Sequence, residues 1–154
     1  MVNIEEIKDS DKKSKITEQI LRSLPDWFEL EQGILDYIKS VQSMPFFITK
    51  INNKIVGFVV IEDYNEFTSE IHVMGILPGF RGKGIGRQII DFVWDRNIKL
   101  GKKYLTVKTL DYSAGDRFYE ETRKFYFAMG FVPIMILKDI WGEDNPCVIM
   151  IKNR

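Results

Sequence analysis

The segment "SEIHVMGILPGFRGKGIGRQII" (residues 69–90) constrains the fold of this chain more than any other feature. Its pattern predicts an apolar strand that ends at a proline and a glycine, then a glycine-rich turn and an amphipathic helix. Gly82, Gly84 and Gly86 alternate at the start of that helix, where each glycine costs roughly 0.5–1 kcal/mol relative to alanine. Folding alone does not explain these glycines, so the turn is a candidate binding site.

Two common phosphate-binding loops do not fit this turn. A P-loop requires a serine or threonine after its lysine, whereas Lys83 is followed by Gly84. The dinucleotide-binding pattern requires a further glycine, but that place holds Arg87 when the pattern starts at Gly82. It holds Ile89 when the pattern starts at Gly84. The turn therefore belongs to neither type.

A metal-free site for a diphosphate fits the turn better. The first N–H groups of a helix have no intrahelical acceptor and lie at the positive end of the helix dipole. Arg81, Lys83 and Arg87 add positive charge around them. The alternative is a solvated basic turn that merely begins the helix, and this alternative stays open.

Length and composition bound the class of protein. The chain has 154 residues, and we expect a single domain over residues 1–154. Lys plus Arg and Asp plus Glu both number 22, so we expect neither nucleic acid nor a membrane surface as a partner. The one cysteine, Cys147, is too few for an internal disulfide or a thiolate zinc site. Without a signal-peptide pattern or an apolar run of roughly 18 residues, we expect a cytoplasmic protein.

The rest of the chain alternates between strand-like and helix-like patterns. Apolar residues at helical spacing indicate helices, and runs of β-branched and aromatic residues indicate strands. The expected strands cover residues 2–8, 46–51, 54–63, 67–77, 102–110, 131–141 and 147–153, and the expected helices cover 16–24, 32–41, 85–100 and 117–129. Asn52 and Asn53 are expected to form a hairpin turn. This order predicts a mixed α/β or α+β sheet covered by helices.

Two parts of the sequence resemble the GNAT superfamily of acetyl-CoA-dependent N-acetyltransferases. The family signature is Gln or Arg, two residues, Gly, one residue, then Gly or Ala, and Arg81, Gly84 and Gly86 match it. The segment "FYFAMGF" (residues 125–131) is similar to the family's Phe-Tyr-x-x-x-Gly-Phe element. The resemblance covers essentially the whole chain. It implies a GNAT-like α/β (α+β) fold, with a mixed, mostly antiparallel twisted sheet of about seven strands flanked by about four helices.

The resemblance also implies acetyl-CoA as the cosubstrate, without a metal. The main chain of Met74, Gly75 and Ile76 is expected to pair with the pantetheine arm, as a peptide-like ligand pairs with an opened sheet edge. Gly75 is expected to be small because the acyl chain passes there. The diphosphate is expected to bind the loop residues, which are Arg81, Gly82, Lys83, Gly84, Ile85, Gly86 and Arg87.

Acetyl transfer to an amine requires groups that move protons. A protonated amine is not nucleophilic, and Glu70 matches the position of a catalytic glutamate in some family members. His72 alternates onto the same face of the strand and is a second candidate base, and a water chain stays open as well. Tyr126 matches the family tyrosine that protonates the leaving thiolate, because Gly130 and Phe131 follow it at the family's spacing. A phenol with a pKa of about 10 keeps its proton and can donate it to the sulfur. Tyr119 is the reserve candidate for this acid.

The segment "PDWFELEQGILDY" (residues 25–37) is acidic and aromatic. If it lines the acceptor side, as in the family, it favours a cationic amine with an apolar body, with Trp27, Phe28 and His72 as substrate-side candidates. A solvated acidic turn with its aromatic rings in the core is the alternative. The expected function is acetyl transfer from acetyl-CoA to a primary amine of a small molecule or peptide, by direct attack in a ternary complex. A non-catalytic acyl-CoA-binding regulatory module is the alternative function, and both a monomer and a homodimer stay open.

Overall fold

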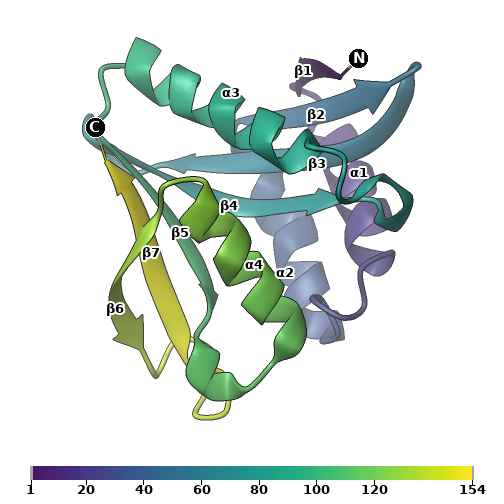
Figure 1. Ribbon diagram of the computed structural model, residues 1–154. Helices are drawn as coiled ribbons and strands as arrows, with labels where there is room; N and C mark the ends of the chain where they lie inside the picture. The colour runs from purple at the N-terminus through teal and green to yellow at the C-terminus, as the bar shows by residue number, and fades with distance from the viewer. Residues whose placement is uncertain (1, 154) are drawn as a thin grey trace. The chain divides into compact units, whose positions relative to one another are not determined.

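The computed structural model describes residues 2–153, and Figure 1 shows its helices and strands. The strands are β1 Asn3–Ile7, β2 Phe46–Ile51, β3 Lys54–Asp63, β4 Thr68–Ile76, β5 Tyr104–Leu110, β6 Val132–Leu137 and β7 Cys147–Asn153. The helices are α1 Ser10–Arg22, α2 Glu31–Ser40, α3 Ile85–Lys99 and α4 Arg117–Ala128, with short 3₁₀ turns η1 Val41–Ser43, η2 Pro78–Phe80 and η3 Tyr112–Ala114. This order of strands and long helices confirms the fold class expected from the sequence.

The seven strands form a sheet in the order β1-β2-β3-β4-β5-β7-β6. β1 with β2, β2 with β3, β5 with β7 and β6 with β7 pair antiparallel. β4 and β5 pair in parallel, and their ladder joins Thr68–Ile71 to Tyr104–Val107. The sheet is therefore mixed and mostly antiparallel.

The chain divides into two compact units, and the first contains the residues up to Glu62 together with His72–Val93. Neighbouring phenylalanines on β2 point to opposite faces of its sheet, as a strand requires. Phe46 stacks on Phe58 at 5.4 Å within the cluster that α1 and α2 cover, and Phe47 contacts Phe92 of α3 at 4.9 Å. Helices therefore cover both faces of these strands, as Figure 1 shows.

Helix α1 begins six residues before the expected start at Ile16. Asp9 caps it, because its carboxylate accepts hydrogen bonds from the backbone N–H groups of Asp11 (2.9 Å) and Lys12 (3.1 Å). Residues 10–15 are polar, so the apolar periodicity begins only at Ile16. A prediction from apolar spacing therefore placed the helix start too late.

The hairpin between β2 and β3 has the predicted turn. Asn52 (φ 51°) and Asn53 (φ 64°) both have left-handed backbone conformations, which suit the right-handed twist of the two strands. The turn fixes which residues of β2 and β3 lie opposite each other.

The second unit contains Asp63–Ile71 and the residues from Trp94 onward. Buried side chains of β5, α4 and β7 form its core, including Leu105, Tyr126 and Met150. Two polar contacts join the second half of α3 to the start of β4 and to the last residue of β3. The buried hydroxyl of Ser69 donates to Asn97, and Arg96 binds the carboxylate of Asp63 through two hydrogen bonds of 2.8 and 3.0 Å.

Candidate functional site

The glycine-rich turn before α3 adopts a backbone that only glycine adopts readily. Gly82 has φ +74° and Gly84 has φ +80°, and a Cβ added to either would meet no protein atom within 4 Å. Lys83 lies between them with a negative φ, since Asn52 and Asn53 are the only non-glycine residues with positive φ in the described range 2–153. Alternating signs of φ turn successive N–H groups toward one side and form a concavity that suits an anion.

The helix start continues this set of donors. The first hydrogen bond of α3 runs from the Gln88 N–H to the Gly84 carbonyl at 3.2 Å. The N–H groups of Ile85, Gly86 and Arg87 precede it and have no intrahelical acceptor. The Ile85 side chain is 2% exposed and so anchors the turn in the core. Open space around the glycines, free donors and a positive dipole end fit a diphosphate without a metal.

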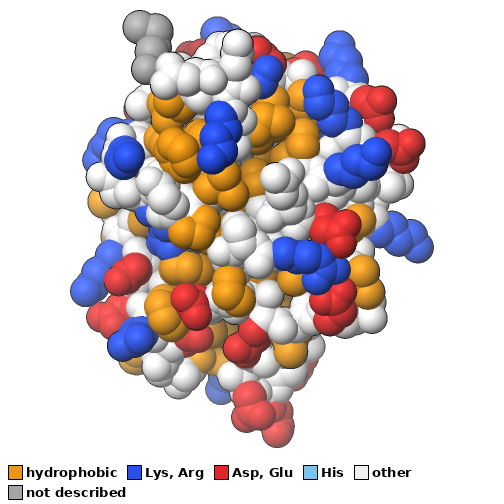
Figure 2. All heavy atoms as spheres, turned by 90° about the vertical axis from the view of Figure 1, so that its right-hand side faces the viewer, with side chains coloured by type: hydrophobic (Ala, Val, Ile, Leu, Met, Phe, Trp, Pro, Cys, Tyr) orange, Lys and Arg blue, Asp and Glu red, His pale blue; other side chains and the backbone are white. Residues whose placement is uncertain are grey.

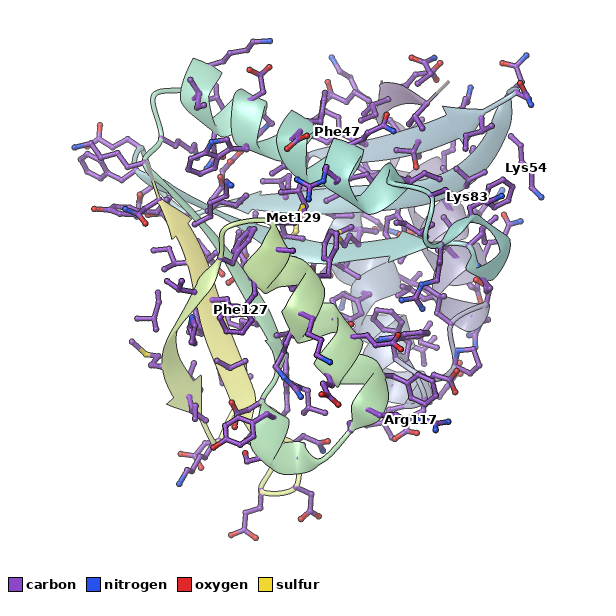
Figure 3. All side chains as sticks on the ribbon, viewed as in Figure 1. Phe47, Lys54, Lys83, Arg117, Phe127 and Met129 are labelled. Carbon is purple, nitrogen blue, oxygen red and sulfur yellow. The ribbon has the colours of Figure 1, made fainter. Side chains whose placement is uncertain are left out.

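The three basic side chains of the turn are exposed. Within residues 2–153, the side chains of Arg81, Lys83 and Arg87 form no ion pair or hydrogen bond. The Nζ atom of Lys83 instead lies 5.6 Å from the ring centroid of Phe80, and the Nζ atom of Lys54 lies 5.3 Å from the same centroid. Figure 3 labels both lysines. Their charges are therefore available to an anionic ligand.

The main chain of β4 beside this turn faces two directions. A Cβ built on Gly57 of β3 would lie 3.0 Å from the carbonyl oxygen of Gly75, so this carbonyl is directed toward β3. Backbone groups of successive strand residues alternate in direction. The N–H and C=O groups of Met74 and Ile76 therefore point to the opposite edge of β4.

The small size of Gly75 has a cause that the sequence did not indicate. A Cβ at this position would lie 3.0 Å from Ile20 of α1, 3.2 Å from Leu24, two residues after the end of α1, and 3.2 Å from Phe58. The glycine lets α1 pack closely against β4, whereas the sequence suggested that the glycine made room for an acyl chain.

The candidate base His72 contacts α2. Its Nε2 lies 2.8 Å from the hydroxyl oxygen of Ser40, and its ring lies 5.3 Å from the ring of Tyr37 in an edge-on arrangement. The ring of Phe28 packs edge-on against the ring of Tyr37, with 6.0 Å between their centroids. His72 and Phe28 therefore belong to one aromatic and polar cluster around α2 in the first unit.

Trp27 lies on the turn between α1 and α2 and contacts the glycine-rich turn. The guanidinium carbon of Arg81 lies 4.0 Å from its ring centroid. The acidic residues around Trp27 differ in their availability. Glu31 binds Arg22 through two hydrogen bonds of 2.7 and 2.8 Å, and this contact holds the pKa of Glu31 below its usual range. Asp26 and Glu29 are exposed and form no ion pair within the described residues.

Glu70 belongs to the second unit and is 5% exposed. Its Oε1 accepts hydrogen bonds from Thr106 (3.1 Å) and Lys108 (3.0 Å), and its Oε2 accepts from Tyr64 (2.7 Å) and Lys108 (2.8 Å). Four contacts use the acceptor sites of a carboxylate in full. Thr106 lies opposite Glu70 in the parallel ladder with β5. Sequence reasoning missed Lys108, because the strand register that brings β5 beside Glu70 has no local signal. It also missed Tyr64, which reaches Glu70 from the turn between β3 and β4.

Tyr126, the candidate acid, lies on α4 and is 5% exposed. Its ring packs edge-on against Phe125 and Phe131, each at 5.3 Å. Gly130 has φ +95° and ends the helix, after which the Phe131 N–H donates to the Tyr126 carbonyl at 3.0 Å. The "FYFAMGF" segment therefore builds the end of α4 and places Tyr126 and Phe131 together in the core of the second unit.

The fold and the candidate site together are a mixed sheet with four helices and a glycine-rich turn at the start of the third long helix. A family model described as an acetyltransferase (GNAT) domain matches residues 42–133, more than half of the chain. The chain therefore belongs to the GNAT acetyltransferase family. The expected class of enzyme, an acyltransferase, is confirmed.

Solved structures with the same fold share little sequence with this chain. A protein assigned to the GNAT family from Desulfovibrio desulfuricans is 16% identical, with 99% of each chain covered and a TM-score of 0.83. A GNAT family acetyltransferase from Elizabethkingia anophelis, solved with acetyl-CoA bound, is 19% identical, covering 99% of this chain and 98% of that one, with a TM-score of 0.76. An aminoglycoside 6'-N-acetyltransferase complexed with coenzyme A is 15% identical, covering 98% and 96%, with a TM-score of 0.75. A search of curated proteins found no match.

No helix in the described range is long and apolar enough to cross a bilayer. Within residues 2–153, no three or more His, Cys, Asp and Glu side chains form a group that could hold a metal ion.

Proposed function

We propose that this protein transfers the acetyl group of acetyl-CoA to a primary amine of a small molecule or peptide, by direct attack in a ternary complex. The observation that carries this proposal is the turn before α3. Two left-handed glycines and free helix N–H groups lie there beside open space, and the side chains of Arg81, Lys83 and Arg87 form no ion pair with any residue in the range 2–153. This combination suits a diphosphate, which coenzyme A carries.

The donor is proposed to extend from this turn along β4. Gly82, Gly84 and Gly86 let the diphosphate approach the backbone, and the N–H groups of residues 85–87 donate to it. The amides of the pantetheine arm pair with the main chain of Met74 and Ile76, whose groups point away from β3. Gly75 contributes close packing of α1 instead, because its own carbonyl faces β3.

Glu70 is proposed as the final acceptor of the proton that the amine loses. Its four contacts leave it no free acceptor site, so the proton reaches it through a partner. Tyr64 is 47% exposed and donates to Glu70, so its hydroxyl can pass its proton to the carboxylate while it accepts one from water. The neighbouring Lys108 balances the negative charge of Glu70 before the transfer.

Tyr126 is proposed as the acid. When the amine nitrogen bonds to the carbonyl carbon, the carbon–sulfur bond breaks and the coenzyme A thiolate leaves. A neutral phenol can protonate that sulfur. Phe125 and Phe131 hold the Tyr126 ring in one orientation, which supports a positioned donor. Tyr119 on the same helix stays the reserve candidate.

The acceptor is proposed to be a cationic amine with an apolar body that approaches the turn between α1 and α2. Asp26 and Glu29 are the acidic groups available there, because Glu31 is bound to Arg22. We assign Phe28 and His72 to the wall of this side. We further propose that the two units work as one acetyltransferase domain, since β3, β4 and α3 each have residues in both of them. We propose the cytoplasm as its compartment.

Thiol release from acetyl-CoA with a panel of amines and peptides tests this function. We expect release with at least one acceptor. Glu70→Gln and Tyr126→Phe should each lower kcat by about 10²-fold with little change in coenzyme A affinity. Tight coenzyme A binding without release for any acceptor, unchanged by Tyr126→Phe, would instead identify a non-catalytic acyl-CoA-binding module.

A further inference from the structure

Arg81 is the first residue of the loop signature, and its guanidinium lies over a ring from another part of the first unit. Its guanidinium carbon lies 4.0 Å from the ring centroid of Trp27, which belongs to the turn between α1 and α2. This separation is well within the range of a cation–π contact. The chain thus brings the segment expected on the acceptor side against the segment expected to hold the donor.

Backbone hydrogen bonds and core packing fix the position of Trp27 next to this cation. The turn after Pro25 is closed by hydrogen bonds from the Trp27 and Phe28 N–H groups to the Leu24 carbonyl, at 3.1 and 3.0 Å. Trp27 also packs against the core cluster that includes Leu24, which is 5% exposed. A cation placed on a fixed ring loses less conformational freedom when it binds a ligand.

The contact with Trp27 also leaves the hydrogen-bond donors of Arg81 available. A guanidinium carries five N–H donors, and an aromatic ring attracts its charge without supplying a carbonyl or carboxylate acceptor. Within the described residues, no protein group accepts a hydrogen bond from this side chain. Its donors can therefore bind a phosphate while the guanidinium stays over the Trp27 ring.

We propose that Trp27 is a positioning residue that holds the Arg81 guanidinium in place for the diphosphate of the donor. This inference rests on the proposed function, because it assumes that coenzyme A occupies the loop. It changes the role of Trp27 from a contact with the acceptor amine to a support for the donor site.

Two variants separate the ring's π-face from its bulk. Trp27→Phe keeps an aromatic face, whereas Trp27→Leu keeps apolar packing without one. The probes are coenzyme A and pantetheine, which lacks the diphosphate, and calorimetry measures both affinities. We expect Trp27→Leu to weaken coenzyme A binding by about 3- to 10-fold and Trp27→Phe by about twofold or less. Pantetheine binding should not change in either variant.

Steady-state kinetics and a double-mutant cycle complete the test. Trp27→Leu should raise KM for acetyl-CoA without lowering kcat or raising KM for the amine. Combined with Arg81→Met, which removes the charge, it should weaken binding no further than Arg81→Met alone. Equal coenzyme A affinity in the wild type and Trp27→Leu, or a change in KM for the amine alone, would overturn the positioning role. If the wild type does not bind coenzyme A at all, the proposed function itself fails.

Discussion

At the scale of single residues, the backbone of Gly84 decides whether the loop before α3 can form. Its φ of +80° belongs to a backbone conformation that residues with a Cβ rarely adopt. Its carbonyl also accepts the first hydrogen bond of α3. A change at this residue therefore acts on the loop and on the helix start together.

Gly84→Ala should destabilise the protein by about 1–2 kcal/mol, because alanine must adopt the left-handed conformation. It should also weaken coenzyme A binding by about tenfold or more, since the added methyl group enters the space proposed for the diphosphate. Urea unfolding and calorimetry measure the two effects. Gly79→Ala is the matched control, because Gly79 has open space around it and no positive φ. Equal behaviour of the two variants would contradict the account of the loop.

Residues that act through distant partners were the hardest to predict. Asn52 and Asn53 were identified correctly, because a left-handed turn is a local property of these residue types. The loop signature was likewise local. The contacts of Glu70 with Lys108 and of Arg81 with Trp27 join residues 38 and 54 positions apart (108 − 70 and 81 − 27), and no periodicity reports such contacts. The register of β4 and β5 determines the first contact, and the packing of the first unit determines the second.

At the scale of elements, the packing of α1 against β4 depends on the absence of a side chain at Gly75. Three apolar groups lie 3.0–3.2 Å from the place that a Cβ would take. Two of them belong to buried residues with little freedom to move, Ile20 and Phe58, which are 2% and 0% exposed. The contact therefore cannot relax cheaply.

Gly75→Ala should lower the free energy of unfolding by about 1–3 kcal/mol, because the added methyl group overpacks this contact. Gly33→Ala in α2 provides the control: a Cβ there meets nothing within 4 Å. Alanine at that helix position should raise stability by about 0.5–1 kcal/mol. Chemical denaturation of both variants measures the difference. A neutral Gly75→Ala would show that α1 does not pack as described.

The end of β3 supplies a prediction about pH. The hydrogen bonds from Arg96, and then the one from Lys102, hold the pKa of Asp63 at about 2, below its ordinary value of 3.8. A carboxyl group whose pKa is lowered on folding stabilises the protein above its unfolded pKa, and this contribution is lost as the pH falls through the folded pKa. Asp63 should therefore contribute at pH 7 and lose its contribution between about pH 4 and pH 2.

Asp63→Asn should cost about 1–2 kcal/mol at pH 7, a value reduced for solvent screening because a third of the side chain is exposed. The difference from the wild type should shrink toward pH 2. Asp95→Asn, which breaks an exposed ion pair with Lys99, should have a much smaller effect. Unfolding curves across this pH range decide the matter, and a pH-independent difference would exclude the ion pair as the cause.

Element boundaries show where sequence patterns were sufficient. The strand expected over residues 67–77 is Thr68–Ile76, and the helix expected over 85–100 is Ile85–Lys99, because Pro78 and Gly101 punctuate them clearly. The start of α1 was placed at Ile16 instead of Ser10, because its first turns are held by the Asp9 cap and carry no apolar stripe. A capping contact competes with periodicity as the signal for a helix start.

At the scale of the whole molecule, positive and negative charges balance, so the attraction of an anion depends on the three basic residues of the loop, Arg81, Lys83 and Arg87. The chain has 22 basic and 22 acidic residues, so no overall field draws an anion to it. Figure 2 shows basic side chains distributed among hydrophobic and acidic ones over one face of the molecule. The proposed affinity for a diphosphate therefore depends on Arg81, Lys83 and Arg87, which form no ion pair among residues 2–153, and on backbone donors.

Calorimetric titration of coenzyme A, in buffer with EDTA, tests the central claim most directly. We predict saturable binding that the chelator does not change and that the triple variant Arg81→Met, Lys83→Met, Arg87→Met weakens by about 100-fold or more. The triple variant Lys12→Met, Lys15→Met, Lys39→Met removes three exposed lysines from α1 and α2 and should leave the affinity within about twofold. Equal affinities in the two triple variants, or no binding by the wild type, would contradict the assignment of the loop as a metal-free diphosphate site.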